Sequence, residues 1–340
     1  MLDDNGHRPT LDTVAARAGV GRGTVSRVIN GSPKVSEQAR EAVLKAIREL
    51  GYVPNQAARS LVRRRTDTVA LVVSESEERL WSEPYFASII RGISKGLADT
   101  GLQLLLTLSH SRAEHAQLER YLAERHVDGL LLVSVHGEDT FSQNMEQLGL
   151  PIVLCGVPVG TRPVSYVDAD NRGGARQAVE YLVGKGRRKI ATIAGSQDMQ
   201  VGVDRLAGYR DSLRTAELPD DPTLIAYGDF SEASGMARTR ELLERHPDLD
   251  AIFTASDPMA FGAMRVLRDA GRRVPDDVAI IGFDDSPTAA QTDPPLTTVH
   301  QPAEAMGREM ARLLVARIRG EQPDPPVTIL STKLVVRDSA

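Results

Sequence analysis

The sequence predicts a small all-α unit at the amino terminus, followed by a larger α/β core of two lobes. Short helical patterns with their capping residues fill residues 10–50, and from residue 68 onward short apolar runs alternate with amphipathic helical patterns. Charge separates the same two parts, because residues 1–65 carry a net charge of +6 and the remainder carries −11. A basic unit on an acidic body is typical of a nucleic-acid-binding module, although a solvated basic surface would carry the same charges.

The composition excludes several classes of protein. A length of 340 residues suggests two or three domains, and 41% hydrophobic with 26% charged residues is usual for a chain with a well-formed core. Apolar runs such as residues 129–133 are far shorter than the roughly 20 residues that cross a bilayer. The acidic, polar start is unlike a secretory signal peptide, so we expect a cytoplasmic protein. Cys155 is the only cysteine, and we expect no disulfide, metal or cofactor.

The amino-terminal unit contains three helical patterns. The first follows the capping residue Thr10 and ends at Gly19, and the second spans residues 22–29. Two short helices joined by a glycine-containing turn predict a helix-turn-helix, whose second helix presents its first turn to the major groove. The third pattern runs from Ser36 to Gly51 and is expected to supply the core through Ala39, Val43, Leu44, Ile47 and Leu50.

Gly19, Gly21 and Gly23 form a Gly-x-Gly-x-Gly string, which also occurs in dinucleotide-binding loops. Such a loop follows a hydrophobic strand, whereas a helical pattern precedes this string, so the sequence disfavours that interpretation. Residues 54–62 form a further helical pattern with proline at its start. It is shorter than the roughly 12 residues at which an isolated helix becomes marginal in water, so we expect it to fold only when held.

Residues 10–30, 35–40, 50–55 and 58–61 closely resemble the head of the lactose-repressor (LacI/GalR) family. The resemblance implies that two hinge helices pair in the minor groove of a near-palindromic operator. Leu61 occupies the position of the leucine that wedges into the central base step, although an ordinary core leucine is the alternative. The DNA contacts that the resemblance implies come from Thr10, Arg22, Gly23, Thr24, Ser26, Arg27, Asn30, Asn55, Ala58, Arg59 and Leu61.

One of these positions departs from the family pattern. Gly23 has no side chain with which to read a base, where many relatives carry one. Arg22 must then supply more of the discrimination, plausibly through a bidentate contact to guanine.

The body resembles the periplasmic sugar-binding-protein fold (type I), which is the known body of this family. The interrupted segments 156–163, 293–302 and 322–327 are the expected passages between its lobes. We therefore predict a helix-turn-helix domain over residues 1–53, a hinge helix and linker over 54–66, and an effector-binding and dimerisation core over 67–340. The predicted first lobe takes residues of about 67–164 and 302–326, and the second takes about 165–299 and 328–340.

Ligands of such sheets bind at the carboxyl ends of the strands, which here meet in the cleft between the lobes. The resemblance implies effector contacts by Arg205, Ser256, Asp257, Asp284 and Gln301, and by Tyr85, Phe86 and Phe230. Planar charged groups pair with vicinal hydroxyls, and aromatic faces cover the apolar side of a pyranose. Arg205 and Asp284 could instead form a structural ion pair, and the aromatic side chains could be plain core residues.

Trp81 lies in an unusual polar insert, residues 76–83, and is either an additional sugar platform or a surface packing residue. Segments 74–84 and 201–208 resemble actinobacterial regulators of cellulose or β-glucoside use. That resemblance implies cellobiose or a related oligosaccharide as the effector.

The expected function is a repressor of carbohydrate-use genes that acts at the nucleoid and leaves palindromic operator DNA when a small sugar binds. We expect a homodimer, because the chain ends without the leucine-repeat helix of the family tetramers. A purine or protein corepressor is the alternative effector, and an exported solute-binding protein would share the body fold. An enzyme is disfavoured, because the sequence has no His-Glu-x-x-His, Gly-x-Ser-x-Gly or P-loop motif, and Asp284 and Asp285 are too close in sequence to flank a glycosidic bond.

Overall fold

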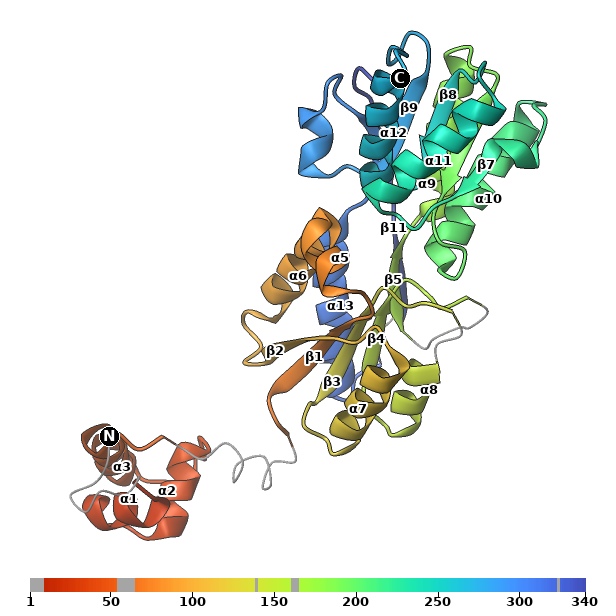
Figure 1. Cartoon of the computed structure of the whole chain (residues 1–340). Coiled ribbons are helices and arrows are strands. Elements are labelled where there is room, and N and C mark those ends of the chain that lie inside the picture. The colour runs from red at the N-terminus through yellow and green to blue at the C-terminus, as the bar shows by residue number, and fades with distance from the viewer. Residues whose placement is uncertain (1–8, 54–64, 138–139, 160–164, 323–324) are drawn as a thin grey trace. The chain divides into compact units, whose positions relative to one another are not determined.

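The computed structural model describes residues 9–53, 65–137, 140–159, 165–322 and 325–340. The chain forms two compact units, residues 1–66 and 67–340 (Figure 1). The first is all-α and the second is α/β, so the predicted fold class is confirmed. Among the described residues, no helix combines the length and apolar character that a membrane crossing requires.

The first unit packs its three helices around a small apolar core. The helices are α1 (Leu11–Ala18), α2 (Arg22–Ile29) and α3 (Glu37–Leu50). Thr10 caps α1, since its hydroxyl accepts a hydrogen bond from the amide of Thr13 at 3.3 Å, and Gly19 ends the helix at φ 66°. The prediction for Leu44 is wrong: its side chain is 41% exposed, because the neighbouring Val43 and Ala46 fill the buried face of α3. The core consists of Val14, Ala15, Val25, Val28, Val43, Ala46 and Tyr52.

The first lobe of the second unit is built on a six-stranded parallel sheet with the order β11-β5-β4-β3-β1-β2. Its strands are β1 (Thr68–Val73), β2 (Gln103–Leu108), β3 (Gly129–Val133), β4 (Ile152–Cys155), β5 (Tyr166–Ala169) and β11 (Val327–Leu330). Its helices are α5 (Glu77–Ser82), α6 (Pro84–Leu97), α7 (Arg112–Ala123), α8 (Thr140–Gln147) and α13 (Ala303–Ile318). Although α13 comes late in the chain, it packs beside α6 (Figure 1).

The second lobe repeats this plan with the strand order β12-β10-β9-β8-β6-β7, in which only β12 runs antiparallel to its neighbour. Its strands are β6 (Ile190–Ala194), β7 (Ile225–Tyr227), β8 (Ala251–Thr254), β9 (Ala279–Asp284), β10 (Thr297–His300) and β12 (Lys333–Val335). Its helices are α9 (Asn171–Gly184), α10 (Gln200–Thr215), α11 (Glu232–Arg245) and α12 (Asp257–Asp269), with short 3₁₀ turns at Pro222–Leu224 and Pro287–Gln291.

The chain passes between the two sheets three times, after β5, β10 and β11. Two of the predicted boundaries are wrong, because residues 166–169 and 328–330 belong to the first sheet. Strand β5 has only four residues and contains Asp168, so its apolar run is too short to stand out in the sequence. Strand β11 lies at the sheet edge and is only partly buried, which removes the same signal.

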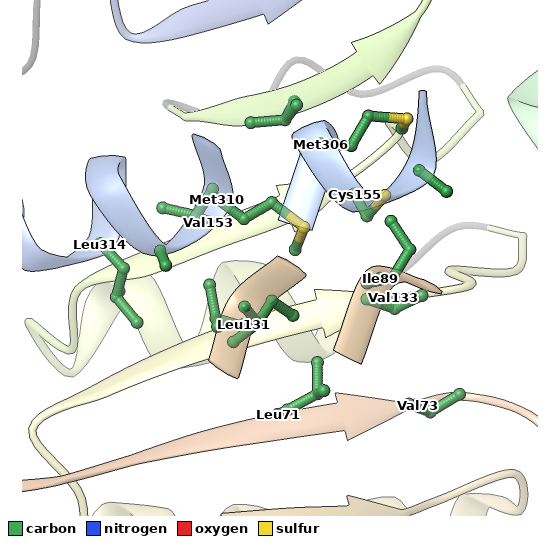
Figure 2. Close-up of a cluster of buried hydrophobic side chains, with 14 of the residues drawn as sticks. Leu71, Val73, Ile89, Leu131, Val133, Val153, Cys155, Met306, Met310 and Leu314 are labelled. Carbon is green, nitrogen blue, oxygen red and sulfur yellow. The ribbon is translucent and has the colours of Figure 1, made fainter. Parts of the chain in front are cut away.

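The core of the first lobe lies between the sheet and the helix pair α6 and α13 (Figure 2). Leu71, Leu131 and Val153 project from neighbouring strands toward this pair. The two helices approach backbone to backbone: a Cβ atom on Gly92 would lie 2.1 Å from the carbonyl oxygen of Glu304. Helix α13 begins directly after the passage that follows β10, and this contact joins it to α6 within the first lobe.

We expect Gly92→Ala to lower the free energy of unfolding by about 1–3 kcal/mol, because the new methyl group must push α13 away. Gly184→Ala is the matched control, since a Cβ atom on this helical glycine meets nothing within 4 Å. That change should leave stability unchanged or raise it by up to about 1 kcal/mol. Urea unfolding of the three proteins measures both values, and an undiminished stability of Gly92→Ala would contradict the close contact.

Candidate ligand cavity and nucleic-acid interface

A cavity lies between the two lobes of the second unit. Ser134, Cys155 and Asp168 reach it from the carboxyl ends of β3, β4 and β5 in the first lobe. Residues that follow or end β7, β8 and β9 reach it from the second lobe. The cavity thus occupies the place where parallel α/β sheets bind ligands, as the sequence predicts. Its other polar and aromatic lining residues are Arg79, Glu83, Tyr85, Phe86, Asn171, Gln200, Arg205, Phe230, Ser256, Asp284 and Gln301.

Arg205, on α10, is 3% exposed, and several chain segments share its guanidinium group. Its Nε donates to Asn171 Oδ1 at 3.0 Å, and its Nη2 donates to Gln301 Oε1 at 2.7 Å. Its Nη1 donates to the carbonyl oxygen of Ala255 at 2.6 Å and lies 3.5 Å from Asp284 Oδ1. Arg205 therefore forms the ion pair with Asp284 that the sequence left as an alternative, while both residues also line the cavity.

Backbone strain marks three of the lining residues. Ser134, Phe230 and Asp284 have φ values of 63°, 71° and 116°, in the region that side chains other than glycine rarely adopt. Such conformations cost on the order of 1–3 kcal/mol each and cluster at ligand sites, where the surrounding structure enforces them. Burial raises the pKa of the Asp284 carboxyl, although the charge of Arg205 opposes this shift.

Asp257 does not line the cavity, so the position of its side chain does not support the predicted effector contact. It is the first residue of α12 and turns toward β9 and β10, where its carboxylate accepts hydrogen bonds from the amide of Ser286 at 2.7 Å and the hydroxyl of Thr298 at 2.5 Å. Gly282 leaves room for it, since a Cβ atom there would lie 2.4 Å from Asp257 Oδ1. Asp257 therefore stabilises the segments next to the cavity without lining it.

Aromatic side chains line both sides of the cavity. The ring of Phe230 packs against Gly195, where a Cβ atom would lie 2.1 Å from the ring. The Tyr85 hydroxyl lies 3.3 Å from Cys155 Sγ, and Tyr85 packs edge to face with Phe86. Ser256 donates to the carbonyl oxygen of Phe230 at 3.0 Å and so helps to hold that residue.

The predicted polar insert forms helix α5 and reaches the cavity through residues that the sequence did not single out. Arg79 lines the cavity, with its guanidinium group 5.5 Å from the ring centre of Phe230, and Glu83 follows the helix. Trp81 is 68% exposed and does not line the cavity, because the phase of this short helix turns it outward while Leu80 is buried. Its predicted role as a sugar platform is not supported by this position.

The signals for the missed residues were present but weak. Glu75, Arg79 and Glu83 are spaced four residues apart with alternating charge, a pattern that predicts ion pairs along one helical face. Asp168 lies near the end of β5, which the sequence did not predict as a strand and whose residues it placed in the second lobe. Burial raises the pKa of Glu83 to about 7 and that of Asp168 to about 6. No group of three or more side chains that could hold a metal ion occurs in the described parts of the chain.

A second polar cluster joins the lobes at His136. The ring Nε2 lies 3.0 Å from Glu75 Oε1 in the first lobe, and Nδ1 lies 2.9 Å from Asp198 Oδ2 in the second. The amide of Gly137 also donates to the carbonyl oxygen of Asp198 at 2.7 Å. The hydrogen bond with Glu75 and that with Asp198 raise the pKa of His136 above its ordinary 6.5, although partial burial opposes them.

In the first unit, the start of α2 is open to solvent. Arg22, Gly23 and Arg27 are exposed, whereas the buried side of the helix consists of Val25 and Val28. Gly21 occupies the N-cap position of α2 without a side-chain cap. The other described DNA-contact candidates are exposed or half-buried: Thr10, Thr24, Ser26 and Asn30. The predicted contacts at Asn55, Ala58, Arg59 and Leu61 lie outside the described residues.

Comparison with known proteins relates both units to one family. Residues 10–55 match the family model for bacterial regulatory proteins of the lacI family, and residues 179–340 match the periplasmic binding protein-like domain. The chain is 57% identical over 334 residues to the HTH-type transcriptional regulator CelR of Thermobifida fusca, across 98% of both chains.

Two solved structures extend this relationship to the fold. A transcriptional regulator CelR-cellobiose complex matches with a TM-score of 0.79 and 55% identity, over 98% of this chain and 100% of the other. The lac repressor dimer bound to operator and the anti-inducer ONPF matches with a TM-score of 0.85 and 29% identity, over 97% and 98% of the two chains. These relatives are regulators of transcription and not enzymes. The chain therefore belongs to the lacI family of bacterial regulatory proteins.

Proposed function

We propose that this protein is a cytoplasmic repressor of carbohydrate-use genes, which acts at the nucleoid and is released from its operator by cellobiose or a related β-glucoside. The observation that carries the proposal is the interlobe cavity, in which aromatic faces and hydrogen-bonded charged groups meet. The similarity to CelR and to its cellobiose complex supports the same ligand class. A purine or protein corepressor is the alternative, and the ligand titrations below distinguish it.

The lining suits a saccharide. The ring faces of Phe230 and Tyr85 offer apolar surfaces of the kind that stack on a pyranose. Asp284 provides acceptor oxygens and Gln301 provides an amide donor, and Arg205 already fixes the orientation of both side chains. A preoriented set of this kind binds vicinal hydroxyls without first ordering its side chains.

Control of DNA binding follows from a change between the lobes. Two chains pair as a homodimer, so that two helix-turn-helix units meet the halves of a palindrome. A ligand that contacts both lobes favours one interlobe arrangement, and we expect that arrangement to weaken the hold of the two helix-turn-helix units on DNA. Ligand and operator then weaken each other's binding by the same coupling free energy, typically about 1–3 kcal/mol.

The ligand half of the proposal is tested by titrating cellobiose into a complex with fluorescent operator DNA and measuring anisotropy. We expect Asp284→Asn to raise the half-release concentration roughly 10- to 100-fold, because a hydroxyl group loses a charged acceptor. Asp285→Asn is the matched control: this neighbour pairs with His300 and Arg337 and does not line the cavity. Equal release of both variants would remove Asp284 from the site. Release by a purine base and not by cellobiose would favour the alternative effector.

The DNA half is tested with Arg22→Ala on a palindromic site selected from random DNA. We expect a loss of about 1–3 kcal/mol at the selected site, since Arg22 lies exposed in the first turn of α2 and Gly23 beside it offers no side chain. Binding to a scrambled duplex serves as the control and should weaken much less. A uniform loss on both duplexes would identify Arg22 as a phosphate contact and not a base-reading residue.

The contact at His136 predicts a pH dependence of ligand binding. When the lobes are closed, the His136 imidazolium contacts the carboxylates of both Glu75 and Asp198. When the lobes separate, it loses the contact with Asp198. The stabilisation of the closed arrangement is therefore fully present below the pKa of His136 in the separated arrangement, where Glu75 still contacts the ring. It is lost as the pH rises through the higher pKa of the closed arrangement. Arg79 faces the same cluster through its ion pair with Glu75 at 2.8 Å and stays charged throughout.

For each protein, we compare the Kd for cellobiose at about pH 8 with that at about pH 6. We expect this ratio to be about threefold to tenfold larger in the parent than in His136→Gln. Glu83 and Asp168 titrate in both proteins, so the difference between the two profiles isolates His136. His126→Gln is the control, because His126 contacts Glu124 of its own lobe. Parallel profiles for the parent and His136→Gln would contradict a role of this contact in closure.

A further inference from the structure

The charges that line the cavity leave little for an anionic ligand to bind. Both cations are engaged by protein groups. Arg79 lies 2.8 Å from Glu75 and 2.7 Å from Glu83, and its guanidinium group faces the ring of Phe230. Arg205 donates to Asn171, Ala255, Asp284 and Gln301. A phosphate group would have to displace a carboxylate from one of these arginines.

Carboxyl groups outnumber the cations on the cavity wall. Glu83, Asp168 and Asp284 line it, against Arg79 and Arg205. Asp168 is 8% exposed, and a single oxygen, Oδ1, accepts from the amide of Ala169 at 2.7 Å and from Asn171 Nδ2 at 2.9 Å. A dianionic phosphate placed here would face three carboxyl groups in a desolvated site, where the penalty for like charges is large.

The helix amino termini at the cavity are also closed to anions. A helix amino terminus is the usual backbone site for phosphate, provided that its amide groups are free. Asp170, Ser231 and Ser256 cap α9, α11 and α12 with their own side chains. Helix α6 follows the carboxylate of Glu83.

The amino termini of α6, α10 and α13 have no side-chain cap, but acidic residues accompany each of them. Glu83 precedes α6, and Glu304 lies in the first turn of α13. The third is α10, whose N-cap residue is Met199. Two acidic residues flank it. Asp198 precedes the helix, and Asp204 accepts a hydrogen bond from Gln200 at 2.8 Å within its first turns. Negative charge at both positions opposes the approach of a second anion.

Building on the proposed sugar response, we infer that the cavity selects uncharged saccharides and rejects their phosphate esters, and that Glu83 and Asp168 determine this selection. Glu83 acts in two ways: it presents its own carboxyl group to the cavity and it holds Arg79 away from an incoming phosphate. Asp168 places a second carboxyl group on the first lobe, opposite Asp284 on the second. The protein would then report imported, unmodified sugar and ignore sugar that a phosphorylating uptake reaction has already esterified.

Isothermal titration of the full chain with cellobiose and with its 6′-phosphate at about pH 8, above the raised pKa values of Glu83 and Asp168, tests the inference. We expect the ester to bind the parent roughly 100-fold more weakly, or worse, than cellobiose. Glu83→Gln and Asp168→Asn should each narrow that ratio by roughly tenfold, because each removes one negative charge, and the first also removes one of the two carboxylate partners of Arg79. Glu77→Gln is the matched control, since Glu77 is exposed on the same helix and does not line the cavity.

Equal affinities of the parent for cellobiose and its ester would overturn the selectivity. An unchanged ratio in both Glu83→Gln and Asp168→Asn would overturn the assignment of these two residues. A parent that binds no saccharide of either kind would overturn the proposed sugar response itself, which is a different result from binding both. Because the first comparison uses only the parent protein, it does not depend on how the variants fold.

Discussion

The core depends on one buried charge, the guanidinium group of Arg205. A cation that is 3% exposed is tolerated only when its hydrogen-bond donors are satisfied, and the satisfying groups come from distant parts of the chain. Asn171 begins α9 directly after the first passage between the lobes, and Gln301 stands in the second passage. Ala255 and Asp284 belong to the second sheet and its connections. The guanidinium group that lines the cavity thus also holds the first two passages between the lobes against the strand ends.

That arrangement explains why the lobes can respond to a ligand. On the side of the passages, the lobes are joined covalently and through Arg205. Elsewhere they meet through single contacts, such as His136 with Asp198 and Arg79 with the ring of Phe230. Contacts of this second kind can break at modest cost, because water and neighbouring charges replace them. A ligand that bridges the lobes adds to them and shifts the balance between arrangements.

The sequence was most informative where a feature depends on local pattern. Helix stops at Gly19 and Gly51, the alternation of strands and helices, and the aromatic and charged residues at strand ends all follow from periodicity, capping or family resemblance. Predictions failed where the direction of one side chain decides the outcome. Trp81 and Arg79 lie two residues apart on a six-residue helix, and only the phase of that helix turns Arg79 inward. Asp257 and Ser256 are adjacent, yet only Ser256 lines the cavity. The side chain of Asp257 occupies the space that Gly282 leaves free. Such choices depend on tertiary packing, which a single sequence does not record.

The helix pair α6 and α13 gives the cavity a rigid connection to the first lobe. Tyr85 and Phe86 stand in the first turn of α6, and Met306 in the first turn of α13 lines the same cavity. Further along, the backbones of the two helices are in contact at Gly92 and Gly307. No side chain lies between them there that could change rotamer to let one helix shift against the other. A displacement at the cavity end must therefore move both helices together over the sheet that begins with β1. The amino-terminal unit comes immediately before this lobe in the chain. The lobe whose helices α6 and α13 line the cavity is therefore also the lobe to which the helix-turn-helix unit is connected. The backbone contact at these glycines thus couples the cavity to the lobe that follows the amino-terminal unit in the chain.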